Sequence, residues 1–132
     1  MPAASPTIAL EAHEADPRRW IVLGVMCLSL LLIVMDNTIV NVAIPTLQED
    51  LGASTSQLQW VVDAYVLVFA GLLLTMGSLG DRFGRRGALA LGLAIMGSAS
   101  ILSAFADSAN QLIVTRAIMG IGAALIMPAT LS

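Results

Sequence analysis

The sequence contains no lysine, one histidine and one cysteine, and charged residues make up only 11% of its 132 residues. A soluble domain ordinarily carries about 25% charged residues, so this shortage of charge argues against a soluble protein. A single cysteine cannot form a disulfide within the chain, and one histidine with one cysteine cannot build a usual four-ligand zinc site. Hydrophobic residues reach 58%, and this excess places the chain among membrane proteins.

The same shortages bear on catalysis and on nucleic-acid binding. No nucleophile has a histidine base, because the single histidine, His13, lies in a polar stretch near the amino terminus. A phosphate-binding P-loop requires a lysine, which the chain lacks. Three arginines beside one aspartate, within residues 80–87, are too few for a nucleic-acid site. We therefore predict a protein that is not an enzyme, holds no metal or organic cofactor, and has no nucleic-acid partner.

Four long apolar stretches account for most of the chain. They cover about residues 20–44, 57–79, 88–106 and 111–132. As helices rising about 1.5 Å per residue, such stretches can cross a hydrocarbon layer of about 30 Å. The first is longer than the apolar core of a signal peptide and is followed by three more. We predict an all-α membrane protein with four transmembrane helices, preceded by a disordered tail over residues 1–17, which are polar and rich in proline and alanine.

Local signals predict where these helices begin and end. Pro45 is expected to end the first helix, because proline cannot donate a helical hydrogen bond, and 46–56 to form a polar loop. Ser54 and Gln57 have the spacing of a capping box at the start of the second helix. Residues 107–110 form a short polar turn before the fourth.

Small residues recur at four-residue steps in the third and fourth spans. Ala90, Ala94 and Ser98 form one such stripe, and Gly120 and Ala124 form another. Small side chains allow helix backbones to approach closely in lipid, where packing drives association. These stripes predict a compact helical bundle.

The arginines are distributed asymmetrically between the predicted loops. Two of them, Arg18 and Arg19, precede the first span, and three lie between the second and third spans. The other two connections contain no cation. By the positive-inside rule, we expect a multi-pass protein of the inner (plasma) membrane with a cytoplasmic amino terminus.

Three ionisable residues fall inside the predicted spans: Asp36, Asp63 and Arg116. Counted from the ends of the spans, the aspartates lie about 13 Å and the arginine about 9 Å below the same membrane face. Such groups usually face a bundle interior or a water-filled cavity. We therefore expect Arg116 to pair with Asp36 or with Asp63, and protonation of the carboxylate to release the pair. A static ion pair that merely satisfies two polar groups is the alternative.

Two asparagines extend this polar region along the first span. Asn37 and Asn41 are four residues apart, so they share one helical face beside Asp36. We predict that Asn37, Asn41 and Asp63 line a cavity. Hydrogen bonding between helices, without contact to a substrate, is the alternative for the asparagines.

Two stretches of the sequence resemble motifs of a known family. Residues Gly77 to Leu89 read GSLGDRFGRRGAL, which resembles the signature loop of the major facilitator superfamily between its second and third spans. Residues Asp36 to Pro45 read DNTIVNVAIP and resemble the first-span motif of the fourteen-span drug–proton antiporters of that superfamily.

Two further stretches are similar to the same branch. Residues 112–124 resemble the antiporter motif of the fourth span, although Met119 stands where glutamine is usual. Residues 59–65 fit the second span, with Asp63 where a small hydroxyl residue is commoner. Together, the resemblance covers about residues 18–132.

The resemblance implies roles for particular residues. The loop aspartate, Asp81, would latch the cytoplasmic side in the outward-facing state, with the neighbouring arginines around it. The residues of this cytoplasmic gate would be Gly77, Asp81, Arg82, Gly84, Arg85 and Arg86. Arg116, with Asp36, would take part in proton coupling.

The resemblance also implies an architecture of two helical bundles that rock about a midplane site. Residues 18–132 would supply four spans of the amino-terminal bundle, and the chain would be an amino-terminal fragment whose partners include the remaining spans of the same transporter. The expected function is secondary active transport, namely proton-coupled efflux of drugs or other hydrophobic or cationic small molecules, with protons as the coupling ion and the lipid bilayer as surroundings. A major facilitator transporter of a metabolite, or a truncated fragment that transports nothing, are the alternatives.

Overall fold

The computed structural model describes residues 16–131, and it consists of four helices joined by short connections. The helices are α1 (Arg18–Leu51), α2 (Thr55–Phe83), α3 (Arg85–Ala104) and α4 (Ala109–Leu131). Each is long and apolar enough to cross a membrane, which confirms the predicted all-α membrane fold. Residues 1–15, which include His13 and nearly all of the predicted disordered tail, lie outside the described part.

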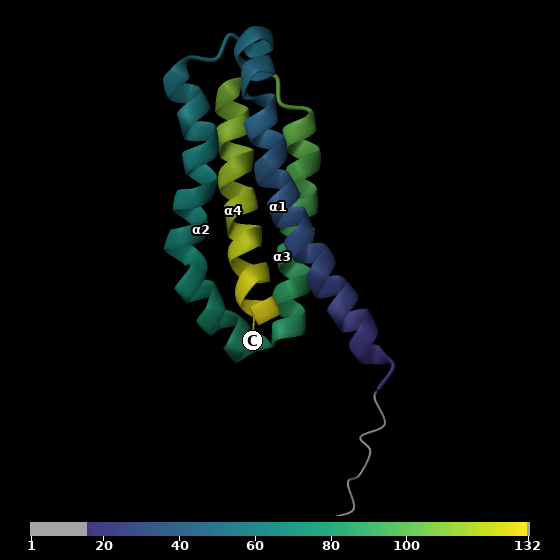
Figure 1. Ribbon diagram of the computed structural model, residues 1–132. Coiled ribbons are helices and arrows are strands. Elements are labelled where there is room, and N and C mark those ends of the chain that lie inside the picture. Colours follow the sequence, from purple (N-terminus) through teal and green to yellow (C-terminus); the bar gives the residue numbers. More distant parts are fainter. Residues whose placement is uncertain (1–15, 132) are drawn as a thin grey trace, which may run out of the picture.

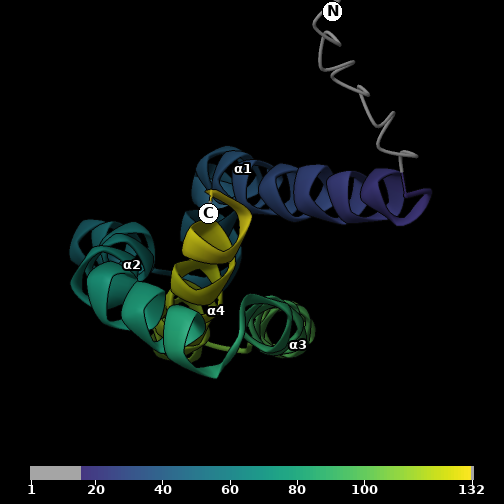
Figure 2. The same ribbon diagram turned by 90° about the horizontal axis from the view of Figure 1, so that it is seen from below.

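The helices alternate in direction, and α4 occupies the centre of the bundle (Figure 1). α2 and α3 lie on either side of α4 and make most of its contacts. The carboxyl-terminal half of α1 lies against the other helices, and α1 diverges from them toward its amino-terminal end (Figure 2). The start of α1, the α2–α3 junction and the end of α4 therefore lie at one end of the molecule.

Glycines on α4 bring its backbone into contact with both neighbours. A Cβ on Gly120 would lie 2.8 Å from the Tyr65 carbonyl oxygen of α2. On the other side, a Cβ on Gly122 would lie 2.9 Å from the Gly92 carbonyl oxygen of α3, and a Cβ on Gly92 would lie 2.8 Å from the Gly122 carbonyl oxygen. These approaches leave no room for a side chain, so the two interfaces require glycine.

The small-residue stripe predicted on α4 is buried, but the one predicted on α3 is not. Gly120 and Ala124 lie inside the bundle. The α3 stripe of Ala90, Ala94 and Ser98 is exposed, so the prediction that it packs within these four helices was wrong. The face of α3 that packs on α4 carries Gly92, Met96 and Ala99 instead, because the reciprocal contact at Gly92 sets the rotation of the helix.

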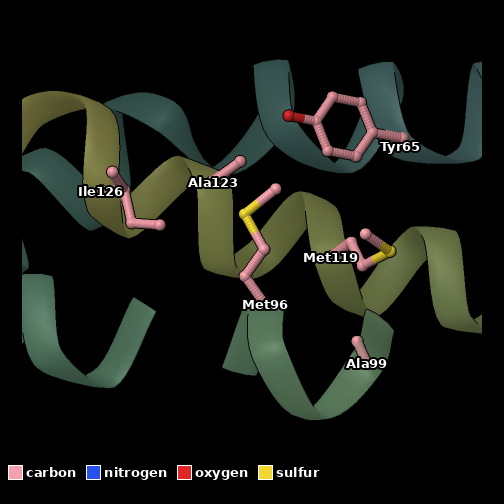
Figure 3. Close-up of a cluster of buried hydrophobic side chains, with 6 residues drawn as sticks. All are labelled: Tyr65, Met96, Ala99, Met119, Ala123 and Ile126. Carbon is pink, nitrogen blue, oxygen red and sulfur yellow. The ribbon is translucent and has the colours of Figure 1, made fainter. Parts of the chain in front are cut away.

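The core lies where α2, α3 and α4 meet (Figure 3). The side chains of its buried cluster come from all three helices: Tyr65, Met96, Ala99, Met119, Ala123 and Ile126. Met96 extends from α3 past α4 toward Tyr65 of α2. α1 contributes only a partly buried residue, Ile33, to the edge of this cluster.

Pro45 does not end the first helix, contrary to the prediction. α1 continues through Pro45 to Leu51 and ends at Gly52, which has a left-handed φ of 57°. Proline removes one backbone hydrogen bond from the helix, but tertiary packing holds the following turns. Ile44 and Leu47 pack against a small cluster of Ala53, Leu58 and Ala109 at this end of the bundle. The predicted loop over 46–56 is therefore short, and most of its residues are helical.

The start of α2 follows the predicted capping box. The Ser54 hydroxyl accepts a hydrogen bond from the Gln57 backbone N–H at 3.3 Å. The Gln57 side-chain oxygen accepts one from the Ser54 backbone N–H at 3.0 Å. Two backbone donors that the helix leaves unpaired are thereby satisfied, and the predicted cap is confirmed.

The charged segment over 80–87, predicted as a loop, is almost entirely helical. Gly84 alone interrupts the helices, with a φ of 101°, a conformation that L side chains rarely adopt. Its N–H donates to the Gly80 carbonyl at 2.9 Å, and its carbonyl accepts from the Ala88 N–H at 3.1 Å. The charges therefore lie on the ends of two rigid helices rather than on a flexible connection.

Candidate functional site

The guanidinium of Arg116 is buried between three helices. Only 2% of Arg116 is exposed, and burying a charge is costly unless it is paired and hydrogen-bonded. Its Nη1 forms an ion pair with the Asp36 carboxylate of α1. Its Nε donates to the Val61 carbonyl of α2 at 3.3 Å, and its Cζ lies 4.4 Å from the centre of the Tyr65 ring. These three contacts together offset the loss of water.

The close approach of α4 to α2 explains why the arginine takes this position. Gly120 follows Arg116 by one helical turn, and it allows the α4 backbone to reach Tyr65. Val61 precedes Tyr65 by one turn on the same face of α2. The guanidinium therefore meets the carbonyl of Val61 and the ring of Tyr65 at once. The ring face is electron-rich and attracts a cation.

Asp36 connects this buried charge with a groove between α1 and α3. Its side chain is 16% exposed. It lines two neighbouring clefts, one of about 290 Å³ that extends to Met96 and Gly97 of α3, and one of about 330 Å³ that is also lined by Arg116. The carboxylate is therefore accessible from the groove, while the guanidinium stays enclosed.

Of the two aspartates considered as partners of Arg116, the structure selects Asp36. Asp63 lies two residues from both Val61 and Tyr65, so it occupies the opposite face of α2. It is half-buried, and its side chain makes no hydrogen bond or ion pair with any residue of 16–131. Similar depth in the membrane correctly predicted the pairing of Arg116 with Asp36. It did not exclude Asp63, because depth says nothing about the direction in which a side chain leaves the helix axis. The cavity-lining role of Asp63 stays a prediction.

The two asparagines beside Asp36 bond to their own helix. The Asn37 amide donates to the Ile33 carbonyl at 2.8 Å, and the Asn41 amide donates to the Asn37 carbonyl at 3.0 Å. Each amide has a second N–H that these bonds leave free, so hydrogen bonding between helices and a role in lining a cavity both stay predictions. Within residues 16–131, no three side chains of His, Cys, Asp or Glu come close enough together to hold a metal ion.

Sequence reasoning overlooked the part that Tyr65 plays in the site. Tyr65 is the chain's single tyrosine, it is only 3% exposed, and its ring stacks on Phe69 with ring centres 6.0 Å apart. Its buried hydroxyl makes no hydrogen bond of good geometry among the described residues, although the Asn37 side chain of α1 is close enough to interact with it. The available signal was its spacing of four residues from Val61, which is visible only once α2 is known to face Arg116.

A second polar contact that the sequence did not reveal joins α3 to α4. The Ser103 hydroxyl donates to the Thr115 hydroxyl at 2.8 Å, and the Thr115 hydroxyl donates to the Leu112 carbonyl at 2.8 Å. Ser103 also lines the cleft that contains Asp36 and Arg116. The α3 side of the site is therefore weakly polar and uncharged.

The predicted gate residues lie at the other end of the helices. Asp81 and Arg85 form an ion pair of 3.3 Å across Gly84, and their side chains are 63% and 49% exposed. Arg82 and Arg86 are exposed and make no ion pair within the described residues. An exposed pair spaced by four residues is worth only about 0.3–0.5 kcal/mol, so this contact can break and re-form easily. The role of these residues as a gate stays a prediction.

Comparison with known proteins connects this arrangement to a family. The family profile described as Major Facilitator Superfamily matches residues 26–132. The puromycin resistance protein of Streptomyces alboniger is 43% identical over 130 residues, which are 98% of this chain and 26% of that protein. The multidrug efflux pump LfrA of Mycolicibacterium smegmatis is 48% identical over 115 residues, which are 87% of this chain and 23% of that protein.

A third relative is covered to the same extent as LfrA. The methyl viologen resistance protein SmvA of Salmonella typhimurium is 46% identical over 115 residues, which are 87% of this chain and 23% of that protein. The chain thus spans about a quarter of the length of the curated relatives it matches. Four apolar helices and the profile match agree on a multi-pass membrane protein. The resemblance found in the sequence is confirmed, and the chain belongs to the major facilitator superfamily of membrane transporters.

Proposed function

We propose that this chain is part of a secondary active transporter that exports drugs or other hydrophobic or cationic small molecules in exchange for protons. The names of three relatives support the export of toxic compounds, since they refer to puromycin resistance, methyl viologen resistance and multidrug efflux. The proposal of proton coupling has different support, which comes from the site itself.

The single observation that carries the proposal is the ion pair between a buried Arg116 and an Asp36 that opens to a groove. Protonation would neutralise the Asp36 carboxylate and remove its attraction for the guanidinium. Arg116 would keep the Val61 carbonyl and the Tyr65 ring, both of which belong to α2. A proton would therefore weaken the connection between α1 and α4 and leave that between α2 and α4 in place. In this way, a change of charge becomes a change in helix packing.

The distribution of arginines supports an orientation in the membrane. Arg18 and Arg19 begin α1, and the three arginines of 82–86 lie at the α2–α3 junction, at the same end of the molecule (Figure 1). The Arg19 guanidinium lies over the Trp20 ring, 5.6 Å from its centre, and this pairing suits a headgroup interface. We assign this end to the cytoplasmic face of the inner membrane.

Substrate preference is the part of the proposal that depends on Asp63. This carboxylate lies on a membrane-spanning helix and has no partner within residues 16–131. Carboxylates at such depth normally face protein or water rather than lipid. A carboxylate that Arg116 does not neutralise favours cationic substrates, whereas the Asp36 carboxylate is already neutralised by the guanidinium.

Export can be tested with the complete gene in a drug-sensitive strain. Susceptibility to cationic dyes and antibiotics should fall on expression, and a protonophore should abolish the protection. In everted membrane vesicles, Asp36→Asn should eliminate dye uptake driven by a pH gradient. Val34→Leu, on the exposed side of α1, is the matched control and should retain uptake.

Two outcomes would contradict the proposal. Unchanged gradient-driven transport by Asp36→Asn would remove this carboxylate from proton coupling. Unaltered susceptibility to all compounds, combined with gradient-driven uptake of a nutrient, would indicate a metabolite transporter.

A further inference from the structure

The Tyr65 hydroxyl is the buried polar atom that the ion pair leaves unexplained. It lies inside the bundle with no hydrogen-bond partner among the described residues. A buried hydroxyl without a partner is unfavourable, and such a group in a native structure calls for an explanation. The ring of the same residue, by contrast, has defined partners, because it contacts both the Arg116 guanidinium and Phe69.

The charged groups around this hydroxyl are those of the ion pair. From α4, the Arg116 guanidinium lies over the Tyr65 ring, with Cζ 4.4 Å from its centre. From α1, the Asp36 carboxylate pairs with that guanidinium, and Asn37 is the next residue of the helix. From α3, the neighbouring side chains of the same cluster are Met96 and Ala99, neither of which titrates. The Asn37 amide donates one N–H to the Ile33 carbonyl, and because an amide does not titrate, its hydrogen-bonding capacity is the same in both states. Asp36 is thus the group near the hydroxyl whose hydrogen-bonding character changes when a proton binds.

We propose that the Tyr65 hydroxyl is the hydrogen-bond partner of Asp36 in its protonated form. One proton binds to the Asp36 carboxylate, and the resulting carboxyl group turns from Arg116 and donates its O–H to the Tyr65 hydroxyl oxygen, a bond that the ionised carboxylate, which only accepts, cannot form. The tyrosine keeps its own proton throughout. In the ionised state, the carboxylate accepts from Arg116 and the hydroxyl has no partner of good geometry. In the protonated state, the hydroxyl gains a partner, so its presence favours binding of the proton.

This inference rests on the proposed function, and it divides the side chain into two parts. The ring positions Arg116 in both states, whereas the hydroxyl acts in one state only. Tyr65 is therefore a positioning residue, because it acts on the proton through Asp36. A hydrogen bond of ordinary strength changes an equilibrium constant by roughly five- to tenfold. The affinity of the site for a proton should depend on the hydroxyl by this factor.

Tyr65→Phe in the complete transporter tests the inference, because it removes the hydroxyl and keeps the ring. Dye transport in everted vesicles is measured against the luminal pH at a fixed external pH. The luminal proton concentration for half-maximal transport should rise roughly five- to tenfold, which moves the midpoint to lower pH. The maximal rate at low luminal pH should be retained. Phe69→Leu, which alters the stacked neighbour without removing a polar group, should leave the midpoint unchanged.

A spectroscopic measurement keeps the inference testable if transport by Tyr65→Phe is impaired. The infrared C=O band of protonated Asp36 is identified by its disappearance in Asp36→Asn. This band should move to higher frequency in Tyr65→Phe, because a hydrogen bond to the carboxyl group is lost. An unmoved band, or an unmoved pH midpoint, would overturn the role of the hydroxyl. If Asp36→Asn itself transports normally with the gradient, the proposed function fails instead.

Discussion

The first and fourth helices differ in a way that their hydrophobicity does not explain. The most apolar 18-residue stretch of α1 has a mean hydropathy of 2.1, against 1.8 for that of α4. Yet only 6% of this stretch of α1 is buried inside the structure, against 56% for α4. In a membrane, apolar side chains gain little by leaving lipid for protein, so close backbone contacts and polar groups decide which helix is enclosed. α4 has Gly120, Gly122 and Arg116, whereas Gly24 of α1 has nothing near it.

The difference also separates two kinds of attachment. α4 is joined to α2 and α3 by backbone contacts that cannot change without separating the helices. α1 is joined to α4 chiefly by the Asp36–Arg116 ion pair and by the small apolar cluster around Ala109. The first attachment does not involve charge, whereas the second depends on it in part.

The largest effect should come from breaking the ion pair. Asp36→Asn leaves Arg116 buried without a counter-charge and should lower the free energy of unfolding by about 3 kcal/mol, at the low end of the range for buried pairs because Asp36 is partly exposed. Arg116→Gln should have a smaller effect, since the carboxylate that it leaves unpaired, Asp36, is partly exposed and can be protonated, whereas the guanidinium is enclosed. In a double-mutant cycle measured by unfolding in detergent, the double variant should be more stable than Asp36→Asn alone. Strictly additive losses would mean that the pair is not coupled.

The next largest effect should come from the glycine contacts of α4. Gly122→Val forces a side chain against the Gly92 carbonyl, which is backbone and cannot turn away, so it should destabilise the protein by about 2 kcal/mol. The matched change on α1 is Gly24→Val, where nothing lies within 4 Å. Thermal unfolding should show a clear loss for the first variant and little for the second. Equal losses would contradict the distinction between the two helices.

A smaller effect is expected at the α2–α3 junction, which keeps both partners of α4 in place. Gly84→Ala should cost about 1–2 kcal/mol, because the residue has a positive φ. Gly87→Ala, three residues later in regular helix with open space around it, should be neutral or slightly stabilising. Thermal unfolding of the two variants compares them directly, and an unaffected Gly84→Ala would show that the junction tolerates another conformation.

The smallest effect on stability should come from the exposed ion pair at the same junction. Asp81→Asn should change the free energy of unfolding by less than about 0.5 kcal/mol. If Asp81 acts as the proposed gate, the same substitution should reduce transport in vesicles severalfold. Normal transport by Asp81→Asn would remove the gate from the account while leaving the bundle intact.

Sequence patterns sufficed for features that depend on local chemistry. The four spans, the Ser54–Gln57 cap and a charge pair at matching depth all follow from composition and spacing. Patterns failed where tertiary packing decides. Ala90, Ala94 and Ser98 looked like a packing stripe, but Gly92 sets the rotation of α3. Pro45 looked like a helix end, but packing of the turns beyond it extends the helix.

Rotation about the helix axis explains the remaining errors in the site. Asp63 and Tyr65 are two residues apart and therefore face opposite ways, yet a count of depth treats them alike. The sequence offered Asp63 beside Asp36 as a possible partner of Arg116, because carboxylates are rare in a membrane span. The structure favours Tyr65, because it shares a face with Val61 and that face meets Arg116.

The most direct test of the account is the distance between α1 and α4 on either side of the pH midpoint of transport. In a Cys27→Ser background, spin labels at Ile21→Cys and Leu131→Cys, both exposed positions, measure the α1–α4 distance. A second pair of labels, at the exposed Leu91→Cys and at Leu131→Cys, measures the α3–α4 distance. Acidification should shift or broaden the α1–α4 distance distribution, and Asp36→Asn should reproduce this change at high pH. The α3–α4 distribution should stay fixed. An α1–α4 distance that ignores both pH and Asp36→Asn would contradict the account.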